Sequence, residues 1–371
     1  MSSDATTYRL PDAGAVINDL PKVSLHDHLD GGLRPATIVE LAGAAGVTLP
    51  TTDPAELGQW FADQSNSGSL VEYLKTFDVT ISVMQTAPQL HRIAKEFVED
   101  LVADGVVYGE VRWAPEQHLQ GGLTLDQAVE AVQAGIEEAV DAAAGGSIRV
   151  GQLVTAMRHA DRALEIAELA VRHRDAGVVG FDIAGAEAGF PPSNHRAAFD
   201  YLASELFPVT VHAGEADGLA SIRSALVDGR ALRLGHGVRI FEDVVLSDAG
   251  DGSTLASLGE VASWVRDREI PLEVSPSSNL QTGAVAAWGD DLADHPFDVL
   301  YQLGFRVTVN TDNRLMSDTS LSKELALLAG TFGYDLDDLA AFQINAALGS
   351  FLPLEDREEI IATITAGHQE A

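Results

Sequence analysis

Eight short runs rich in apolar and β-branched residues recur along the chain. Runs of this length and composition predict β-strands. The last run begins with alternating apolar and polar positions and ends at Asp312, directly before Asn313. Asp and Asn are common in turns, so this pair by itself predicts only that a strand stops there. The runs are residues 22–28, 106–113, 148–156, 178–185, 208–214, 231–237, 270–276 and 305–312.

The stretches between these runs have the spacing of helices. Thr124 and Gln127 fit a capping box at the start of one predicted helix. Gly177 follows another predicted helix, where a C-terminal cap is expected. In a third stretch the apolar residues fall on one helical face, namely Leu90, Ile93, Ala94, Phe97 and Leu101.

Strands that alternate with helices predict parallel pairing, and eight such units predict a (β/α)8 TIM barrel of the α/β class. A barrel of this kind takes roughly 250 residues, and this chain has 371. The surplus lies mainly between the first two strands, so we expect a helical insertion over residues 33–100. No linker rich in Pro, Gly or Ser divides the chain, which predicts one domain over residues 1–371.

Composition narrows the classes of function. The net charge of −33 argues against nucleic acid and anionic membranes as partners. The chain has no apolar run of about 18 residues or more, so no membrane span is expected. The N-terminus has no signal-peptide pattern, so we expect a cytoplasmic protein. The chain has no cysteine, which excludes disulfides, thiolate zinc sites and cysteine nucleophiles. The oligomeric state and the reason for the negative charge stay open.

In barrels of this kind the chemistry lies at the carboxyl ends of the strands. The first predicted strand carries His26 and His28, which alternation places on one face. The fifth ends with His212, the sixth with His236 and the eighth with Asp312. Three neutral imidazoles and a carboxylate suit a divalent cation, zinc above all. Such an ion lowers the pKa of a bound water, so the pattern predicts a metal-dependent hydrolase.

The four lysines are absent from the second to eighth predicted strands, which argues against a modified lysine that bridges two metals. We therefore expect one metal ion. The missing cysteines also exclude the cysteine-ligated cytidine-type deaminases.

Several motifs, in order along the chain, resemble those of the adenosine deaminase family within the amidohydrolase superfamily. They are "PKVSLHDHLDGG" (21–32), "SLVEYLKTFD" (69–78), "GVVYGEVRWAP" (105–115), "MRH" (157–159), "GFDIAGAE" (180–187), "VHAGEA" (211–216), "LGHG" (234–237), "SPSSN" (275–279) and "NTD" (310–312). The resemblance covers nearly the whole chain. It implies hydrolytic deamination of adenosine and 2′-deoxyadenosine, in purine salvage.

The resemblance also implies roles for single residues. Glu215 would give a proton to N1 of the purine, and His236 would orient the zinc-bound water and help to remove its proton. Asp30 would contact the sugar hydroxyl and Gly185 the base, through its backbone. One zinc ion per subunit would be bound by His26, His28, His212 and Asp312. An apolar lid over the ligand would be formed by Leu70, Tyr73, Leu74 and Phe77.

The chemistry of deamination supports the role of Glu215 independently. C6 becomes tetrahedral when hydroxide attacks it, and N1 must then gain a proton from a nearby acid. We therefore expect the pKa of Glu215 to be raised in a desolvated pocket. Arg112, Arg158 and Asp182, which lie near strand ends, are interpreted as a buried ion-pair layer under the site. His159 has no assigned role.

Asn313 stands where many relatives have a second aspartate, which faces purine N7. N7 is an acceptor, and the Asn313 amide can donate to it at any pH. Substrate binding should therefore be retained. A related 6-aminopurine nucleoside such as aminodeoxyfutalosine, or free adenine, remains an alternative substrate. A catalytically inactive binding protein on the same barrel would have lost a ligand or Glu215, and this chain keeps them all.

Overall fold

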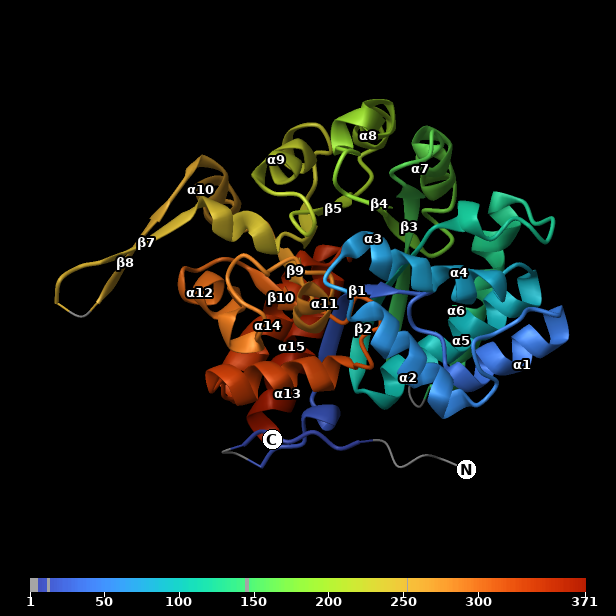
Figure 1. Cartoon of the computed structure of the whole chain (residues 1–371), viewed down its shortest axis with the longest axis horizontal. Helices are drawn as coiled ribbons and strands as arrows, with labels where there is room; N and C mark the ends of the chain where they lie inside the picture. Colours follow the sequence, from blue (N-terminus) through green and yellow to red (C-terminus); the bar gives the residue numbers. More distant parts are fainter. Residues whose placement is uncertain (1–5, 12–13, 144–146, 252) are drawn as a thin grey trace.

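The computed structural model describes residues 6–11, 14–143, 147–251 and 253–371, and its centre is a ring of parallel strands (Figure 1). All eight predicted strands are present. They are β1 (Lys22–His28), β2 (Val106–Trp113), β3 (Arg149–Met157), β4 (Val178–Ala184), β5 (Thr210–Ala213), β6 (Arg233–His236), β9 (Leu272–Val274) and β10 (Val307–Val309).

The strands pair in the order of a (β/α)8 barrel. One four-stranded sheet has the order β1-β2-β3-β4 and the other the order β10-β9-β6-β5. Two isolated parallel bridges, Asp27 to Asp312 and Phe181 to Val209, link these sheets at both edges. Asp312 lies beyond the last residue of β10. Its bridge to Asp27 holds the two segments that carry predicted metal ligands side by side.

Helices surround the strands in the arrangement that the alternation predicted (Figure 1). The segment between β1 and β2 holds α1 (Pro35–Ala45), α2 (Pro54–Ser65), α3 (Leu70–Tyr73), α4 (Phe77–Ser82) and α5 (Ala87–Ala103). The others are α6 (Leu125–Ala142), α7 (Ala163–Arg172), α8 (Arg196–Ser204), α9 (Leu219–Val227), α10 (Glu260–Asp267), α11 (Pro276–Gln281), α12 (Phe297–Gln302), α13 (Leu321–Phe332), α14 (Leu336–Gly349) and α15 (Leu354–Glu370).

The local helix signals were mostly correct. The predicted apolar face of α5 is buried, and Thr124 and Gln127 form the capping box of α6. The cap predicted at Gly177 is wrong, because α7 ends at Arg172 with His173 as its C-cap. Gly177 lies in the turn before β4, where its φ of +91° favours glycine.

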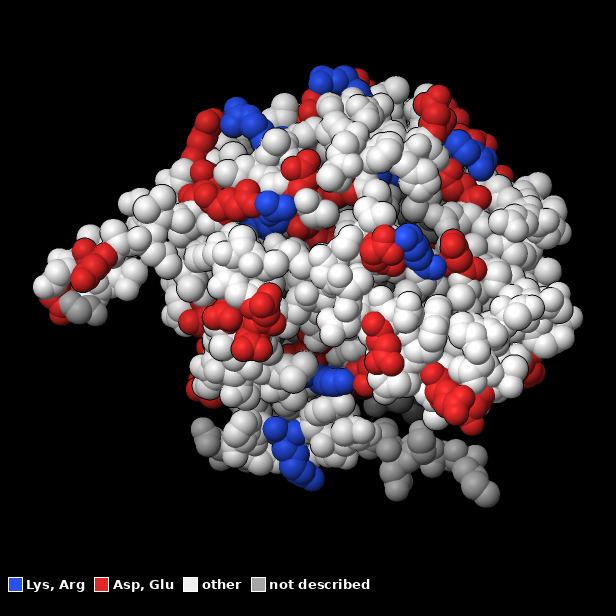
Figure 2. Space-filling model, viewed as in Figure 1, with Lys and Arg blue, Asp and Glu red and all other residues white. Residues whose placement is uncertain are grey.

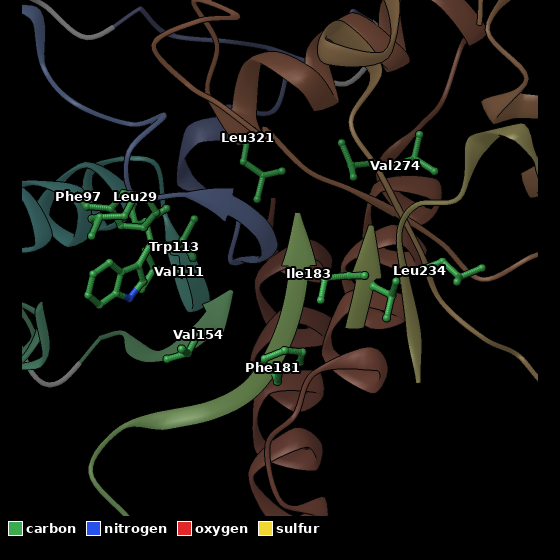
Figure 3. Close-up of a cluster of buried hydrophobic side chains, with 14 of the residues drawn as sticks. Leu29, Phe97, Val111, Trp113, Val154, Phe181, Ile183, Leu234, Val274 and Leu321 are labelled. Atoms are coloured by element: carbon green, nitrogen blue, oxygen red, sulfur yellow. The ribbon is translucent and has the colours of Figure 1, made fainter. Parts of the chain in front are cut away.

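The main core lies between the strands and the helices that cover them. Val111, Val154, Ile183 and Val274, from four different strands, are fully buried in one large apolar cluster (Figure 3). Burial of such side chains contributes roughly 1.5–3 kcal/mol each. This packing gives the strand ends a rigid base.

The segment over residues 69–78, which carries the expected lid, is not one continuous helix. The structure instead has α3, a 3₁₀ turn at Leu74–Thr76 and then α4. Thr76 Oγ1 donates to the Tyr73 carbonyl oxygen at 2.7 Å, which competes with the regular helical bonding there. Short 3₁₀ turns inside a helix are frequent at hinges.

A hairpin formed by β7 (Val244–Asp248) and β8 (Thr254–Leu258) projects from the body of the molecule (Figure 1). The eight-strand pattern missed it, although the alternation in "VVLSD" and the turn residues of "DAGDGS" are hairpin signals. Acidic side chains are spread over the visible face, with fewer basic ones between them (Figure 2). Among the described residues, no helix is long and apolar enough to cross a membrane.

Candidate active site

The strand ends bring the predicted metal ligands together. His26, His212, His236 and Asp312 present ligand atoms that all lie within 4.8 Å of one another. His28 joins them, because its Nε2 lies 3.3 Å from His212 Nε2 and 3.3 Å from Asp312 Oδ1. His236 and Asp312 have φ near +60°, which costs a non-glycine residue roughly 1–2 kcal/mol. Strain of this kind is typical of functional sites.

Two of the imidazoles are oriented by buried carboxylates. His26 Nδ1 lies 3.0 Å from Glu273 Oε2, and His212 Nδ1 lies 2.8 Å from Asp182 Oδ2. Each Nδ1 therefore carries the proton and each Nε2 keeps its lone pair. His26 Nε2, which is buried, finds no hydrogen-bond donor and lies 3.3 Å from Asp312 Oδ1. Lone pairs that converge in this way fit a divalent metal ion.

The pKa shifts of His28, His212 and Asp312 match this interpretation. The pKa of His26 is raised instead, because its burial is outweighed by its hydrogen bond to Glu273 and by the nearby Asp312. Burial is the largest influence on His28 and His212 and lowers the pKa of both imidazoles, so they are neutral at pH 7. Burial alone would raise the pKa of Asp312, but the imidazoles of His26, His236 and His28 around it hold the pKa well below the usual value. Ser278 Oγ donates to Asp312 Oδ2 at 2.6 Å, which leaves Oδ1 for the cation.

Glu215 lies beside this cluster and is almost completely buried. Its Oε2 is 3.5 Å from His236 Nε2. Desolvation raises the pKa of Glu215 well above its usual value, and the charges of Asp312 and Glu187 raise it further. A raised pKa of this kind favours the protonated form that a general acid needs.

The loop that carries Glu215 is wrapped around a second carboxylate, Glu187. The backbone N–H groups of residues 214–217 all donate to Glu187, at distances of 2.7 to 3.0 Å. Four such bonds fix the loop and hence the direction of the Glu215 side chain. Sequence reasoning missed this residue. The signal was its place at the end of the quoted motif "GFDIAGAE".

A cavity of about 600 Å³ opens above the cluster. Asp30 is buried at its edge, and burial raises the pKa of this carboxyl to about 7. Gly185 has a φ of +102°, and a side chain there would come within 3.1 Å of Met157 Cε. His159, which had no assigned role, also lines the cavity. All predicted site residues except His26, which lies fully buried beneath, contribute to the lining.

Asn313 reaches the cavity through the absence of a side chain at Gly31. A Cβ at that position would lie 2.0 Å from Asn313 Oδ1, so only glycine leaves room for the amide. Asn313 is 3% exposed, and its Oδ1 has no hydrogen-bond partner. A buried acceptor without a donor is costly, which indicates that a donor of the ligand completes the bonding of this oxygen. Purine N7 is itself an acceptor and could only pair with the amide nitrogen of Asn313.

The ion-pair layer predicted under the site exists, with one correction. Arg112 Nη1 lies 3.1 Å from Asp182 Oδ2, and Arg112 Nη2 lies 2.7 Å from Glu273 Oε2, all fully buried. Arg158 does not pair with a carboxylate in this layer; it donates to the carbonyl oxygen of His212 at 2.9 Å. Glu273 was missed, because a single Glu in a short apolar strand gives no signal of its partners.

Two solved structures share the fold of this chain. A solved adenine deaminase from Arthrobacter aurescens shares it with a TM-score of 0.79 at 24% identity, over 94% of this chain and 98% of that one. An amidohydrolase from Burkholderia ambifaria, solved with bound Zn, has a TM-score of 0.82 at 23% identity, over 98% and 96%.

The sequence comparison is more specific. The chain belongs to the adenosine deaminase family, since residues 21–367 match the family model described as Adenosine deaminase. Adenosine deaminase from Mycobacteroides abscessus is 56% identical over 348 residues, which cover 93% of this chain and 94% of the relative. Adenosine deaminase 1 from Streptomyces coelicolor is 58% identical over 93% of this chain and 86% of its own length.

A solved structure with a bound ligand also resembles this chain. Arabidopsis ADAL, in complex with GMP, has a TM-score of 0.79 and 26% identity, over 96% of this chain and 99% of that one. Together with the family match, this likeness indicates a purine substrate.

Proposed function

We propose that this protein deaminates adenosine and 2′-deoxyadenosine to inosine and deoxyinosine, with release of ammonia, in purine salvage. The observation that carries the proposal is Glu215, a buried carboxyl group with a raised pKa in the same cavity as the metal-binding cluster. Its proton suits N1 of a 6-aminopurine, which must be protonated as C6 becomes tetrahedral. The names of the relatives at 55 to 58% identity support the same substrate.

The cluster would hold one zinc ion per subunit through His26, His28, His212 and Asp312. A divalent ion there supplies Lewis-acid chemistry, which turns water into a hydroxide nucleophile near neutral pH. The choice of zinc rests on the donor set, because imidazole nitrogens with one carboxylate are typical of catalytic zinc sites. The groups that hold the imidazoles, Glu273 and Asp182, support the same geometry.

The side chains around the cavity would divide the work on the base. Glu215 gives its proton to N1, His236 orients the attacking oxygen toward C6, and ammonia leaves C6 as the product forms. Asn313 donates to N7, and Gly185 contacts the base through its backbone. The sum is water plus adenosine to inosine plus ammonia, so no further co-reactant is needed.

The upper part of the cavity favours a nucleoside over a free base. Asp30 has one buried oxygen without a partner. Its carboxyl group would accept a hydrogen bond from the sugar hydroxyl or, when protonated, donate one to it. The apolar side chains of residues 70–77 would cover the ligand, and the 3₁₀ turn between α3 and α4 would let this lid move. Aminodeoxyfutalosine and free adenine remain the alternatives. A single domain, a cytoplasmic location and a lack of nucleic-acid or membrane partners remain predictions.

A substrate panel tests this proposal. Adenosine, deoxyadenosine, adenine and aminodeoxyfutalosine are incubated with zinc-loaded protein, and purine absorbance and ammonia are followed with and without a chelator. We expect turnover of adenosine and deoxyadenosine that the chelator abolishes and zinc restores. Inactivity on every 6-aminopurine after zinc loading would overturn the deaminase assignment, whereas a preference for adenine would overturn only the role of Asp30.

A further inference from the structure

Two buried residues behind His236 have no place in the reaction described above. Asn279 belongs to α11 and is fully buried, and His295 precedes α12 and is 2% exposed. Neither lines the cavity. They nevertheless connect the backbone of Phe297 to His236 through three successive hydrogen bonds. The distances are 3.1 Å from Phe297 N to His295 Nδ1, 3.4 Å from His295 Nε2 to Asn279 Oδ1, and 3.0 Å from Asn279 Nδ2 to His236 Nδ1.

The direction of the first bond is fixed. A backbone N–H can only donate, so His295 Nδ1 must accept from Phe297 and cannot carry a proton. The proton of a neutral His295 is therefore on Nε2. The ring stays neutral, because burial lowers the pKa of His295 to about 3.

The direction of this bond determines the directions of the other two, from His295 to Asn279 and from Asn279 to His236. His295 Nε2–H donates, so the group of Asn279 that faces it must be the carbonyl oxygen. The opposite amide orientation would set two donors against each other. Asn279 Nδ2 then faces His236 Nδ1 and donates to it. His236 Nδ1 is an acceptor, and the proton of this imidazole is on Nε2, the atom that faces Glu215 and the metal-binding cluster.

We propose that Asn279 and His295 are positioning residues that hold His236 in the Nε2–H tautomer, so that His236 donates a hydrogen bond to the attacking oxygen and cannot take its proton. This inference rests on the proposed function for the identity of that oxygen. It departs from the role that the family resemblance implies, in which His236 also helps to remove the proton. A bound cation would lower the pKa of the water, so that its proton would pass to bulk solvent.

The neighbouring imidazoles show the opposite arrangement. Glu273 accepts from Nδ1–H of His26, and Asp182 Oδ2 lies 2.8 Å from Nδ1 of His212, so a carboxylate faces Nδ1 of each ring and leaves Nε2 free to bind a cation. A carboxamide donates to Nδ1 of His236, which leaves Nε2 as a donor. His236 has a ligand atom close enough to join the cluster. We call the three hydrogen bonds from Phe297 through His295 and Asn279 to His236 the relay. The relay explains why His28 is the third imidazole ligand in our proposal and His236 is not.

Nuclear magnetic resonance of the zinc-loaded protein, with ¹⁵N-labelled histidine, tests the tautomer directly. The His236 resonances are identified by their loss in a His236→Asn variant. We expect a protonated, pyrrole-like Nε2 and an unprotonated, pyridine-like Nδ1. The reverse pattern in the wild-type protein would overturn the relay without any measurement of activity.

Two variants test the source of the tautomer. Asn279→Asp replaces the donor with a carboxylate of the same shape, so the His236 proton should move to Nδ1. We expect kcat to fall about 10- to 100-fold with little change in KM and one zinc per chain. His295→Gln keeps a donor near Asn279 and should keep the wild-type pattern, whereas His295→Leu should weaken it. His118→Gln, which removes a buried histidine outside the relay, is the matched control and should leave the His236 resonances unchanged.

These outcomes separate the relay from the deaminase assignment. An Nε2–H tautomer that Asn279→Asp reverses would support the relay even if no 6-aminopurine were deaminated. Deamination of adenosine by a protein with Nε2 unprotonated would overturn the relay and leave the proposed function intact. If Asn279→Asp does not fold, the pair His295→Gln and His295→Leu decides: identical His236 tautomers in both would contradict the relay.

Discussion

Buried carboxyl groups lie in two places at the cavity, and their pKa values are shifted in opposite directions. We call the layer beneath the cluster, with Glu273, the floor, and the lining with Glu215 and Asp30 the wall. On the floor, burial alone would raise the pKa of Glu273, but the guanidinium groups of Arg112 and Arg233 outweigh burial and hold the pKa well below its usual value. On the wall, burial raises the pKa of Glu215 well above its usual value and that of Asp30 to about 7. Neither wall residue has an ion pair with Arg or Lys among the described residues.

The two guanidinium groups therefore distinguish Glu273 from Glu215 and Asp30, because all three carboxyl groups are buried. The charged floor accepts hydrogen bonds and holds imidazoles in the orientation that a metal ion needs. The neutral wall keeps protons that it can donate to a substrate. The predictions below change one group at a time on each side of this comparison.

The largest effect is expected at the wall. Glu215→Gln removes the proton that N1 must receive, so kcat on adenosine should fall by about 10² to 10⁴. The metal content should stay at the wild-type level, because Glu215 is not a proposed ligand. Ammonia release and metal analysis measure the two quantities.

Asp217→Asn is the matched control, since Asp217 belongs to the same loop and its N–H also donates to Glu187. This variant should retain most of the wild-type rate. A Glu215→Gln protein that kept most of its turnover would refute the assignment of Glu215 as the proton donor.

On the floor, Glu273→Gln should mainly affect stability. It leaves two buried guanidinium groups without their shared carboxylate, which costs about 3–5 kcal/mol in the free energy of unfolding. Urea denaturation measures this. Glu359→Gln, which breaks an exposed pair with Arg149, should change the free energy of unfolding little. Equal effects of the two substitutions would contradict the account of the floor.

Asn313 offers a wall group that carries no charge at any pH. With 7-deazaadenosine, carbon replaces N7 and the Asn313 amide loses its acceptor, at a cost of about 1–3 kcal/mol. We expect kcat/KM to be about 10- to 100-fold lower than for adenosine. Equal kcat/KM values for the two substrates would rule out this role for Asn313.

The smallest effect concerns pH and stability. The pKa of Asp30 is raised from 3.8 to about 7 on folding, so the folded state binds its proton more tightly than the unfolded state. The stabilisation is complete below about pH 4 and is lost as the pH rises toward about 7. Asp30→Asn removes this dependence. The free energy of unfolding of the wild type minus that of the variant should therefore fall between about pH 5 and pH 8, and a rise of this quantity would be the wrong sign.

The barrel could be predicted from the sequence because eight apolar runs and the helices between them are local signals. The site could be predicted because His26, His28, His212, His236 and Asp312 stand at strand ends, which a barrel brings to one face. The structure places all of them together. Their separate roles stay a prediction until metal and substrate are tested.

The supporting groups could not be predicted, because their partners are distant in the sequence. Glu273 lies 247 residues from His26, which it orients. Glu187 acts on backbone groups, whose positions depend on the packing of a loop. The exposed hairpin was missed because it lies outside the alternation of barrel strands and helices.

The protonation state of Glu215 tests the central claim most directly. Infrared difference spectra of zinc-loaded wild type minus Glu215→Gln at neutral pH isolate the carboxyl stretch of this one residue. The account predicts the band of a protonated, buried carboxylic acid, which is converted to carboxylate bands only as the pH is raised. Carboxylate bands already present at neutral pH would contradict it, because an ionised Glu215 has no proton to give to N1.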